Sequence, residues 1–205
     1  MEPPRLVRAA TRVVTALGRA RRLRVRHPNG TDLTVERAAR APFADLGRPD
    51  PAAGIVWSRV PAGLVAVSLR SGTTRGVWES NRSTYDRLVR APVTSGSRFS
   101  FRDGRLVDAE FDRGGEPFDA VVSRVGGDRP RAVAVTVGVN PALTAAPEVE
   151  SLPEGTLGLL IADAPYRPGG ARPTFSFLTT LADADVDADG RSWLRAGRPA
   201  EDGAA

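Results

Sequence analysis

The chain has 205 residues, of which 41% are hydrophobic and 26% are charged, so it can bury a core and is not disordered throughout. It contains no cysteine and no lysine, which excludes a disulfide framework and a lysine Schiff base. A histidine-based catalytic triad would have to use the single histidine, His27. No apolar run reaches the roughly 18 residues of a membrane span, and no secretory signal is recognisable, so we expect a cytoplasmic protein without a membrane partner.

The formal net charge is +5, and all 29 basic residues are arginine. Guanidinium groups pair bidentately with carboxylates and phosphates, which favours an acidic peptide or a nucleic acid as partner. The 24 acidic residues balance most of this charge. The arginines are also spread along the chain without a nucleic-acid-binding motif, which makes a nucleic acid the weaker of the two hypotheses.

Residues 1–22 are expected to form a basic N-terminal helix, with the helical pattern over 4–22. Apolar side chains recur there at helical spacing, at Leu6, Ala10, Val13, Val14 and Leu17. Arginines at positions 5, 8, 12, 19, 21 and 22 supply the charge. Two interpretations stay open: the helix packs on the rest of the protein, or it docks a partner.

From residue 23 the pattern changes to short alternating segments. Turn residues predict hairpins at 23–35, at 97–112 around Asp103-Gly104, and at Asp189-Gly190. Strands are expected near 55–58, 64–70, 75–79, 131–139 and 156–162, a helix at 115–125 and a loop at 37–54, whereas 80–90 is undecided between helix and irregular structure. We therefore predict an α+β fold: one domain over 23–198 with a mixed, twisted β-sheet, few helices, and a disordered tail at 199–205.

Five short segments occur in an order that resembles one enzyme family. They are N-G-T-D-L-T at 29–34, P-A-G at 61–63, G-V-N at 138–140, G-T through the aspartate at 155–163, and G-G at 169–170 with D-G at 189–190. Together they are similar to motifs in the C-terminal half of the aminopeptidase T-like metallopeptidases. The resemblance covers roughly residues 23–197 and implies the fold of that half, with the N-terminal domain of the family missing.

The positions that would hold the metal ions in that family carry non-coordinating residues here. The two glutamates of the family motifs fall on Leu64 and Ala134, and a histidine falls on Gly158. The segment Pro173–Leu181, where a further histidine and aspartate are expected, contains no His, Asp or Glu. The resemblance therefore implies a truncated hydrolase that has lost its metals, with no cofactor and no catalytic residue.

Such a remnant resembles the truncated hydrolase-like accessory proteins of crocagin-type biosynthesis of ribosomal peptide natural products. That resemblance implies binding of a precursor peptide, acidic in this case, and its presentation to modifying enzymes. The candidate peptide-binding residues are Arg5, Arg8, Arg12, Arg70, Phe175 and Phe177. The two phenylalanines are expected in the region of the lost metal site, where they either fill it or form the floor of a groove.

Three alternatives stay open: a metal-dependent hydrolase with a rearranged site, a basic nucleic-acid-binding module, and a structural or homodimerisation module. His27 is interpreted as a turn residue. The aspartates at 183, 185, 187 and 189 are interpreted as a strand face that ends in a turn, because Ala188 and Leu194 occupy positions where a calcium loop needs Gly and Glu. Glu154 and Asp163 are interpreted as surface charges.

Overall fold

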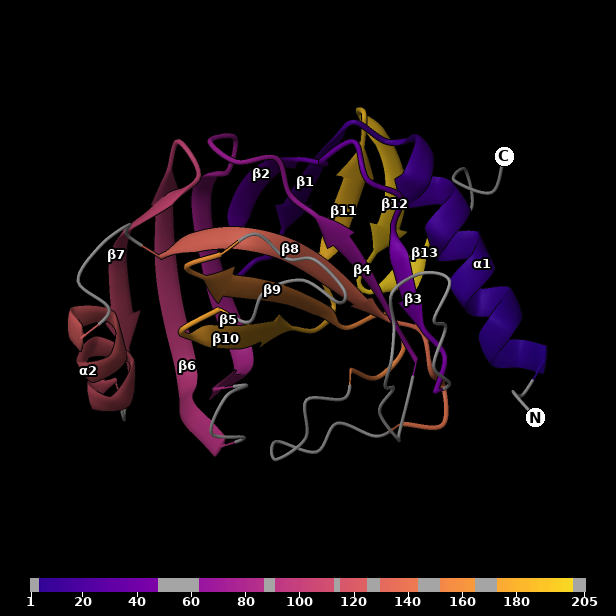
Figure 1. Cartoon of the computed structure of the whole chain (residues 1–205). Helices are drawn as coiled ribbons and strands as arrows, with labels where there is room; N and C mark the ends of the chain where they lie inside the picture. The colour runs from indigo at the N-terminus through magenta and orange to yellow at the C-terminus, as the bar shows by residue number, and fades with distance from the viewer. Residues whose placement is uncertain are drawn as a thin grey trace.

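The computed structural model describes residues 4–47, 63–86, 91–112, 115–124, 130–143, 152–164 and 173–200. In this part of the chain, two helices accompany thirteen strands that belong to one sheet. All pairings between the named strands are antiparallel, and one isolated bridge, between Asn140 and Pro153, is parallel. The predicted twisted sheet with few helices and an N-terminal helix is confirmed (Figure 1), whereas the expectation of a mixed sheet needs correction, because its named strands pair only antiparallel.

Six strands form a closed ring. They are β5 (Arg75–Asp86), β6 (Ala91–Arg102), β7 (Arg105–Phe111), β8 (Arg131–Gly138), β9 (Leu157–Ala162) and β10 (Ser176–Leu181). Each pairs with the next, and β10 pairs back with β5. The link between β7 and β8 is the weakest, since it consists of the single pair Arg105 and Arg131.

Strand β5 also connects the ring to the strands that lie outside it. Its first residues pair with β2 (Asp32–Glu36), and its last residues, from Thr84, pair with β10. A register shift between Ser80 and Ser83 separates the two halves, and such irregularities bend a strand. The outer run continues through β1 (Arg22–Arg26), β11 (Asp185–Ala188), β12 (Arg191–Arg195) and β13 (Arg198–Pro199). On the other side, β4 (Leu64–Ser68) pairs with β8, and β3 (Phe43–Asp45) pairs with β4.

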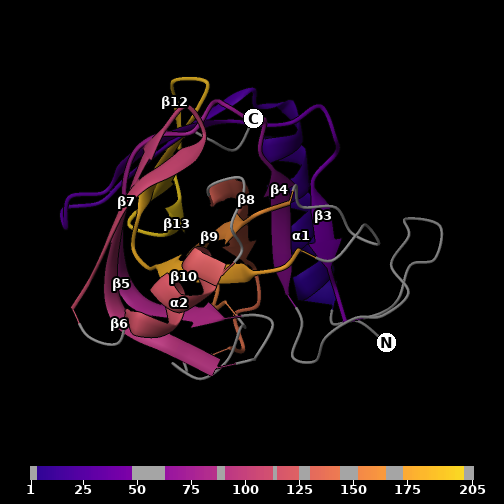
Figure 2. The same ribbon diagram turned by 60° about the vertical axis from the view of Figure 1, so that its left-hand side comes forward.

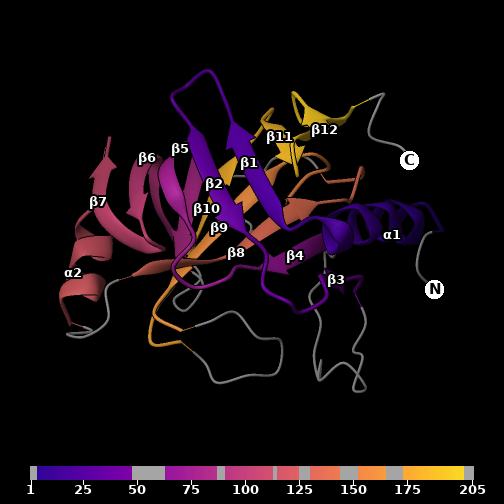
Figure 3. The same cartoon turned by 90° about the horizontal axis from the view of Figure 1, so that it is seen from above.

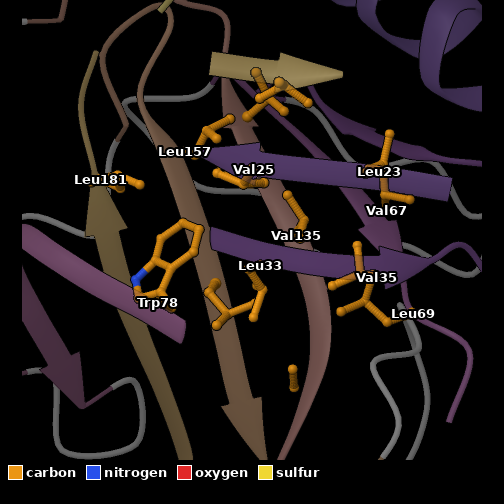
Figure 4. Close-up of a cluster of buried hydrophobic side chains, with 14 of the residues drawn as sticks. Leu23, Val25, Leu33, Val35, Val67, Leu69, Trp78, Val135, Leu157 and Leu181 are labelled. Carbon is orange, nitrogen blue, oxygen red and sulfur yellow. The ribbon is translucent and has the colours of Figure 1, made fainter. Parts of the chain in front are cut away.

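The bending folds the sheet over itself and encloses one large core. Leu23 and Val25 of β1, with Leu33 of β2, are buried against Val135 of β8 (Figure 4). Trp78 of β5 is 0% exposed, and its indole N–H donates to the Thr179 hydroxyl at 3.2 Å. That bond satisfies the polar group that burial of a tryptophan would otherwise leave without a partner.

The two helices lie at opposite ends of the sheet (Figures 1 and 3). Helix α1 (Pro4–Arg19) packs Leu6, Ala10 and Leu17 into the core beside β4 and β3. Its basic side chains face outward. The structure therefore shows the helix packed on the domain, and it ends three residues before the predicted boundary because Arg22 already begins β1.

Helix α2 (Glu116–Arg124) stands beside β7, where the ring is weakly linked (Figure 2). Its Phe118 is 2% exposed, and its ring lies 4.8 Å from that of Phe177, 5.2 Å from Phe111 and 5.6 Å from Phe99. Tilted and edge-on ring pairs at these separations are favourable. This aromatic cluster packs α2 against β6, β7 and β10 of the ring.

Several local predictions need correction. The undecided segment 80–90 is the continuation of β5 as far as Asp86, and the predicted loop at 37–54 contains the short strand β3. The predicted tail begins too early, because Arg198 and Pro199 pair with β12 and the Ala200 amide donates to the Trp193 carbonyl at 2.9 Å. The strand expected at 55–58, the motif segments at 61–62 and 169–170, and residues 201–205 lie outside the described residues.

Candidate binding site

Arginines 5, 8, 12 and 19 share one side of α1, because their spacings of three, four and seven residues match the helical period. The first three line one hollow of about 570 Å³, which we call the α1 hollow. Val7, Ala9 and Thr11 complete the helix wall, and Pro141 and Glu154 form the other wall. The structure thus brings together three of the predicted peptide-binding residues, Arg5, Arg8 and Arg12.

These three guanidinium groups have no ion pair in the part of the chain that the structure describes. The first turn of α1 carries no acidic residue, although an acid there would interact favourably with the positive end of the helix dipole. Arg5 and Arg8 stand near that end, where a cation is unfavourable. The helix thus concentrates positive charge over the hollow, and an anionic ligand would relieve it.

Arg70 belongs to a different surface. Its guanidinium lies 3.3 Å from the Glu36 carboxylate on β2, and Arg22 lies 3.7 Å from the same carboxylate. The Arg70 amide also donates to the Glu36 carbonyl at 2.8 Å. Arg70 does not line the α1 hollow, so it contributes no direct contact to a peptide bound there.

A second hollow, of about 540 Å³, lies on the outer face of the sheet and is lined by arginines that already have partners. Arg24 donates two hydrogen bonds to Asp32, at 2.8 and 2.7 Å. This bidentate bond raises the pKa of Arg24 and lowers the pKa of Asp32. Arg75 pairs with Asp103 at 2.8 Å. Since internal carboxylates neutralise these cations, the second hollow is less suited to an anion than the α1 hollow.

Phe175 and Phe177 are 1% and 0% exposed. Both belong to the main core, and their ring centroids lie 6.0 Å apart. Neither interpretation is observed as stated, because both side chains are buried in the main core and, in this structure, neither fill the expected metal site nor face a surface-bound peptide. The expected location also needs correction: Phe177 pairs with Ile161 in the main core, whereas Leu178 and Thr180 lie on the face of β10 that Gly158 shares.

The three positions that the resemblance assigned to metal ligands do share one face. Leu64 lies opposite Gly138, and Gly158 lies opposite Thr136, two residues along β8 from Ala134. Directly paired residues and residues two apart point to the same side of a sheet. Leu64, Ala134 and Gly158 therefore lie on the same face of the sheet, opposite the main core.

The residues on this face do not fit a metal ion. A Cβ atom placed on Gly158 would lie 2.3 Å from the Thr136 hydroxyl oxygen and 2.7 Å from Leu178 Cδ1, so neighbouring side chains already occupy the space. Thr136 is 6% exposed, and its hydroxyl has no hydrogen-bond partner among the described residues. No group of three or more His, Cys, Asp or Glu side chains suited to a metal occurs in the described ranges.

The remaining polar candidates form hydrogen bonds to backbone amides or ion pairs with neighbouring strands. His27 is a turn residue, as predicted: its Nδ1 accepts the Asn29 amide at 3.1 Å. Asp189 accepts the amides of Arg21 and Arg22 at 2.9 and 2.8 Å, which lowers the pKa of its carboxyl group. Asp187 pairs with Arg26 at 2.6 Å. These contacts agree with the interpretation of the aspartates as a strand face and turn.

Sequence reasoning missed the wall opposite α1. Glu154 was interpreted as a surface charge, and Pro141 carried no signal. The turn that contains Glu154 is joined to the end of β8 by the bridge between Asn140 and Pro153, a contact that no local pattern reveals, and Glu154 lines the hollow beside α1. The exposure of Glu154 itself agrees with the interpretation.

Comparison with known proteins shows the fold. No family model matches the chain, and no curated protein matches it. Among solved structures, 2,5-dihydroxypyridine dioxygenase from Pseudomonas putida KT2440 is similar with a TM-score of 0.74 and 12% identity, over 98% of this chain and 60% of that one. Wild-type AmpT from Thermus thermophilus is similar with a TM-score of 0.68 and 19% identity, over 95% of this chain and 54% of that one.

These similarities establish a fold-level relation to AmpT, an aminopeptidase T, which is the coarse part of the predicted resemblance. The chain spans little more than half the length of each of these two proteins. Within the described ranges, neither helix is long and apolar enough to cross a membrane. At 12% and 19% identity, the activities of the two proteins do not transfer to this chain.

Proposed function

We propose that this protein is a non-catalytic accessory protein that binds an acidic segment of a precursor peptide and presents it to the enzymes that modify it. The observation that carries the proposal is the α1 hollow, in which Arg5, Arg8 and Arg12 face solvent together without an ionic partner in the described chain. Three convergent guanidinium groups can each take a carboxylate bidentately.

The residues at the ancestral metal face support a non-catalytic role. Leu64, Ala134 and Gly158 offer neither a ligand nor a general base. The side chains of Thr136 and Leu178 occupy the volume in which a ligand at position 158 would stand. The truncated-hydrolase resemblance gives this combination a context, since accessory proteins of modified-peptide pathways resemble such remnants.

The contrast between the two hollows supports an acidic peptide over a nucleic acid. The broad outer face of the sheet, which a duplex would need, interleaves its arginines with Asp32, Asp187 and Glu36. Its positive charge is therefore largely neutralised, and phosphates would meet these carboxylates. The α1 hollow instead gathers three arginines without an ionic partner in the described chain at one small site, which suits a short segment.

The test is fluorescence anisotropy with a labelled ten-residue peptide of alternating glutamate and serine. We expect saturable micromolar binding that weakens at least about tenfold in R5A/R8A/R12A, at about 0.5–1 kcal/mol for each exposed ion pair lost. The control variant, R21A/R102A/R191A, removes the same charge from exposed arginines outside the hollow and is expected to bind within about threefold of the wild type.

Two results would contradict the proposal. Equal losses in both triple variants would show that binding follows net charge and not the hollow. Tighter binding of a single-stranded oligonucleotide than of the peptide, with a steep dependence on salt, would favour the nucleic-acid alternative.

A further inference from the structure

The arginines of the α1 hollow face a negative charge on the opposite wall. We propose that Glu154 is the specificity determinant of this hollow, and that it selects peptides in which an acidic run is accompanied by a basic side chain. This inference rests on the proposed function, because it names the class of peptide that the same hollow takes.

Backbone contacts hold Glu154 in place. Its amide donates to the Asn140 carbonyl at 3.3 Å, and the next amide, of Gly155, donates to the Gly138 carbonyl at 3.0 Å. Gly155 has a φ of +77°, and a Cβ there would lie 2.1 Å from the Gly197 carbonyl oxygen. The turn is therefore hydrogen-bonded to the end of β8 and packed closely against the β12–β13 turn, which fixes the backbone at Glu154.

The carboxylate is exposed and has no ion pair among the described residues, although it lines the same hollow as Arg5, Arg8 and Arg12. The hollow thus presents three cations on the helix wall and one anion on the wall across from it. Pro141 and Val7 add apolar surface to the two walls. An occupant that matches all these groups carries carboxylates along one side and a cation on the other.

A purely acidic segment would meet repulsion at this wall, because like charges in close apposition oppose binding. A lysine or arginine in the segment would instead pair with Glu154 while the carboxylates pair with α1. Charge arrangement of this kind adds more to specificity and to the association rate than to affinity. Glu154 is accordingly expected to discriminate among peptides of similar affinity.

The experiment uses labelled ten-residue glutamate-rich peptides that carry one lysine near the amino end, in the centre or near the carboxyl end. Each is matched with a peptide that carries norleucine at the same position. We expect wild-type protein to prefer at least one lysine peptide over its norleucine partner by about threefold to tenfold at fixed salt. In E154Q this preference disappears, and the norleucine peptide binds as tightly as in wild type or more tightly.

The variant E110Q is the control, since Glu110 is an exposed carboxylate on β7 outside the hollow. It is expected to keep the wild-type preference. Retention of the full preference in E154Q, or no preference in wild type, would overturn the role of Glu154 and leave the proposed function standing. If neither lysine nor norleucine peptides bind wild-type protein, the proposed function fails and this inference fails with it.

Discussion

The substitution Gly158→Ala tests whether the face that carries Leu64, Ala134 and Gly158 is filled by neighbouring side chains. The new Cβ would lie 2.3 Å from the Thr136 hydroxyl oxygen, 2.7 Å from Leu178 Cδ1 and 3.2 Å from Leu152 Cδ1, whereas ordinary contacts begin at 3.4 Å. Overpacking of a core costs about 1–3 kcal/mol, and replacing a strand glycine offsets this by about 0.5–1 kcal/mol. Because the 2.3 Å approach to Thr136 is a severe clash, the cost lies in the upper part of that range, about 2–3 kcal/mol, and we expect a net loss of about 1–2.5 kcal/mol in the free energy of unfolding.

The assay is urea unfolding of the parent, G158A, T136A and the double variant. Because Thr136 is the nearest obstacle, T136A/G158A should recover most of the penalty, with a coupling energy of about 1 kcal/mol or more. Unchanged stability in G158A would refute the reasoning, since it would show open space beside Gly158. A penalty that persists in full in the double variant would place the obstacle elsewhere, at Leu178 or Leu152.

Three further substitutions test the account of the fold. Phe118→Ala should cost about 3–5 kcal/mol in urea unfolding, because it removes a ring buried among three others; a loss below about 1 kcal/mol would show that this cluster does not anchor α2 to the ring. Asp189→Asn should make the free energy of unfolding depend less on pH in the acid range. The pKa of the Asp189 carboxyl is lower in the folded state than in the unfolded state. Its contribution to the free energy of unfolding is therefore complete above the unfolded-state pKa of about 3.9 and is lost as the pH falls through the folded-state pKa. Unfolding midpoints between pH 5 and pH 2 should therefore decline less in the variant, and parallel declines would contradict this assignment. Thr136→Val should leave stability unchanged or raise it by up to about 1 kcal/mol in the same assay, because the buried hydroxyl has no partner in the described chain; a clear loss would reveal an unrecognised hydrogen bond.

Local turn chemistry made much of the fold predictable. Asp103-Gly104 and Asp189-Gly190 adopt positive φ angles at both residues, with φ of 49° and 77° in the first turn and 49° and 81° in the second. Aspartate and glycine tolerate that conformation better than most residues, and it is the one that a two-residue hairpin turn requires. The hairpins therefore follow from a few residues, and the structure confirms them.

Closure of the ring could not be predicted in the same way. It depends on β10 meeting β5, with Thr179 opposite Thr84, and the packing of α2 onto the ring depends on Phe118 meeting Phe177. Neither contact leaves a periodic signal in either segment. The expectation that Phe177 lies at the metal face failed for a related reason, because its register on β10 decides which face it occupies, and a one-residue shift exchanges the two.

The candidate site was predictable on one wall only. Helical spacing identifies Arg5, Arg8 and Arg12 as one side of α1, so their convergence follows from the sequence. Arg70 was grouped with them on charge alone, and the structure separates it because Glu36 binds it. Glu154 enters the hollow through a bridge between Asn140 and Pro153, which only the three-dimensional fold provides.

The most direct test of the central claim is one calorimetric titration of wild-type protein with the ten-residue glutamate–serine peptide, followed by mass spectrometry of the recovered peptide. We predict saturable heat with a micromolar or lower Kd and a peptide of unchanged mass. Absence of binding heat at millimolar peptide, or a peptide cleaved or modified by the protein alone, would contradict a non-catalytic peptide-binding function.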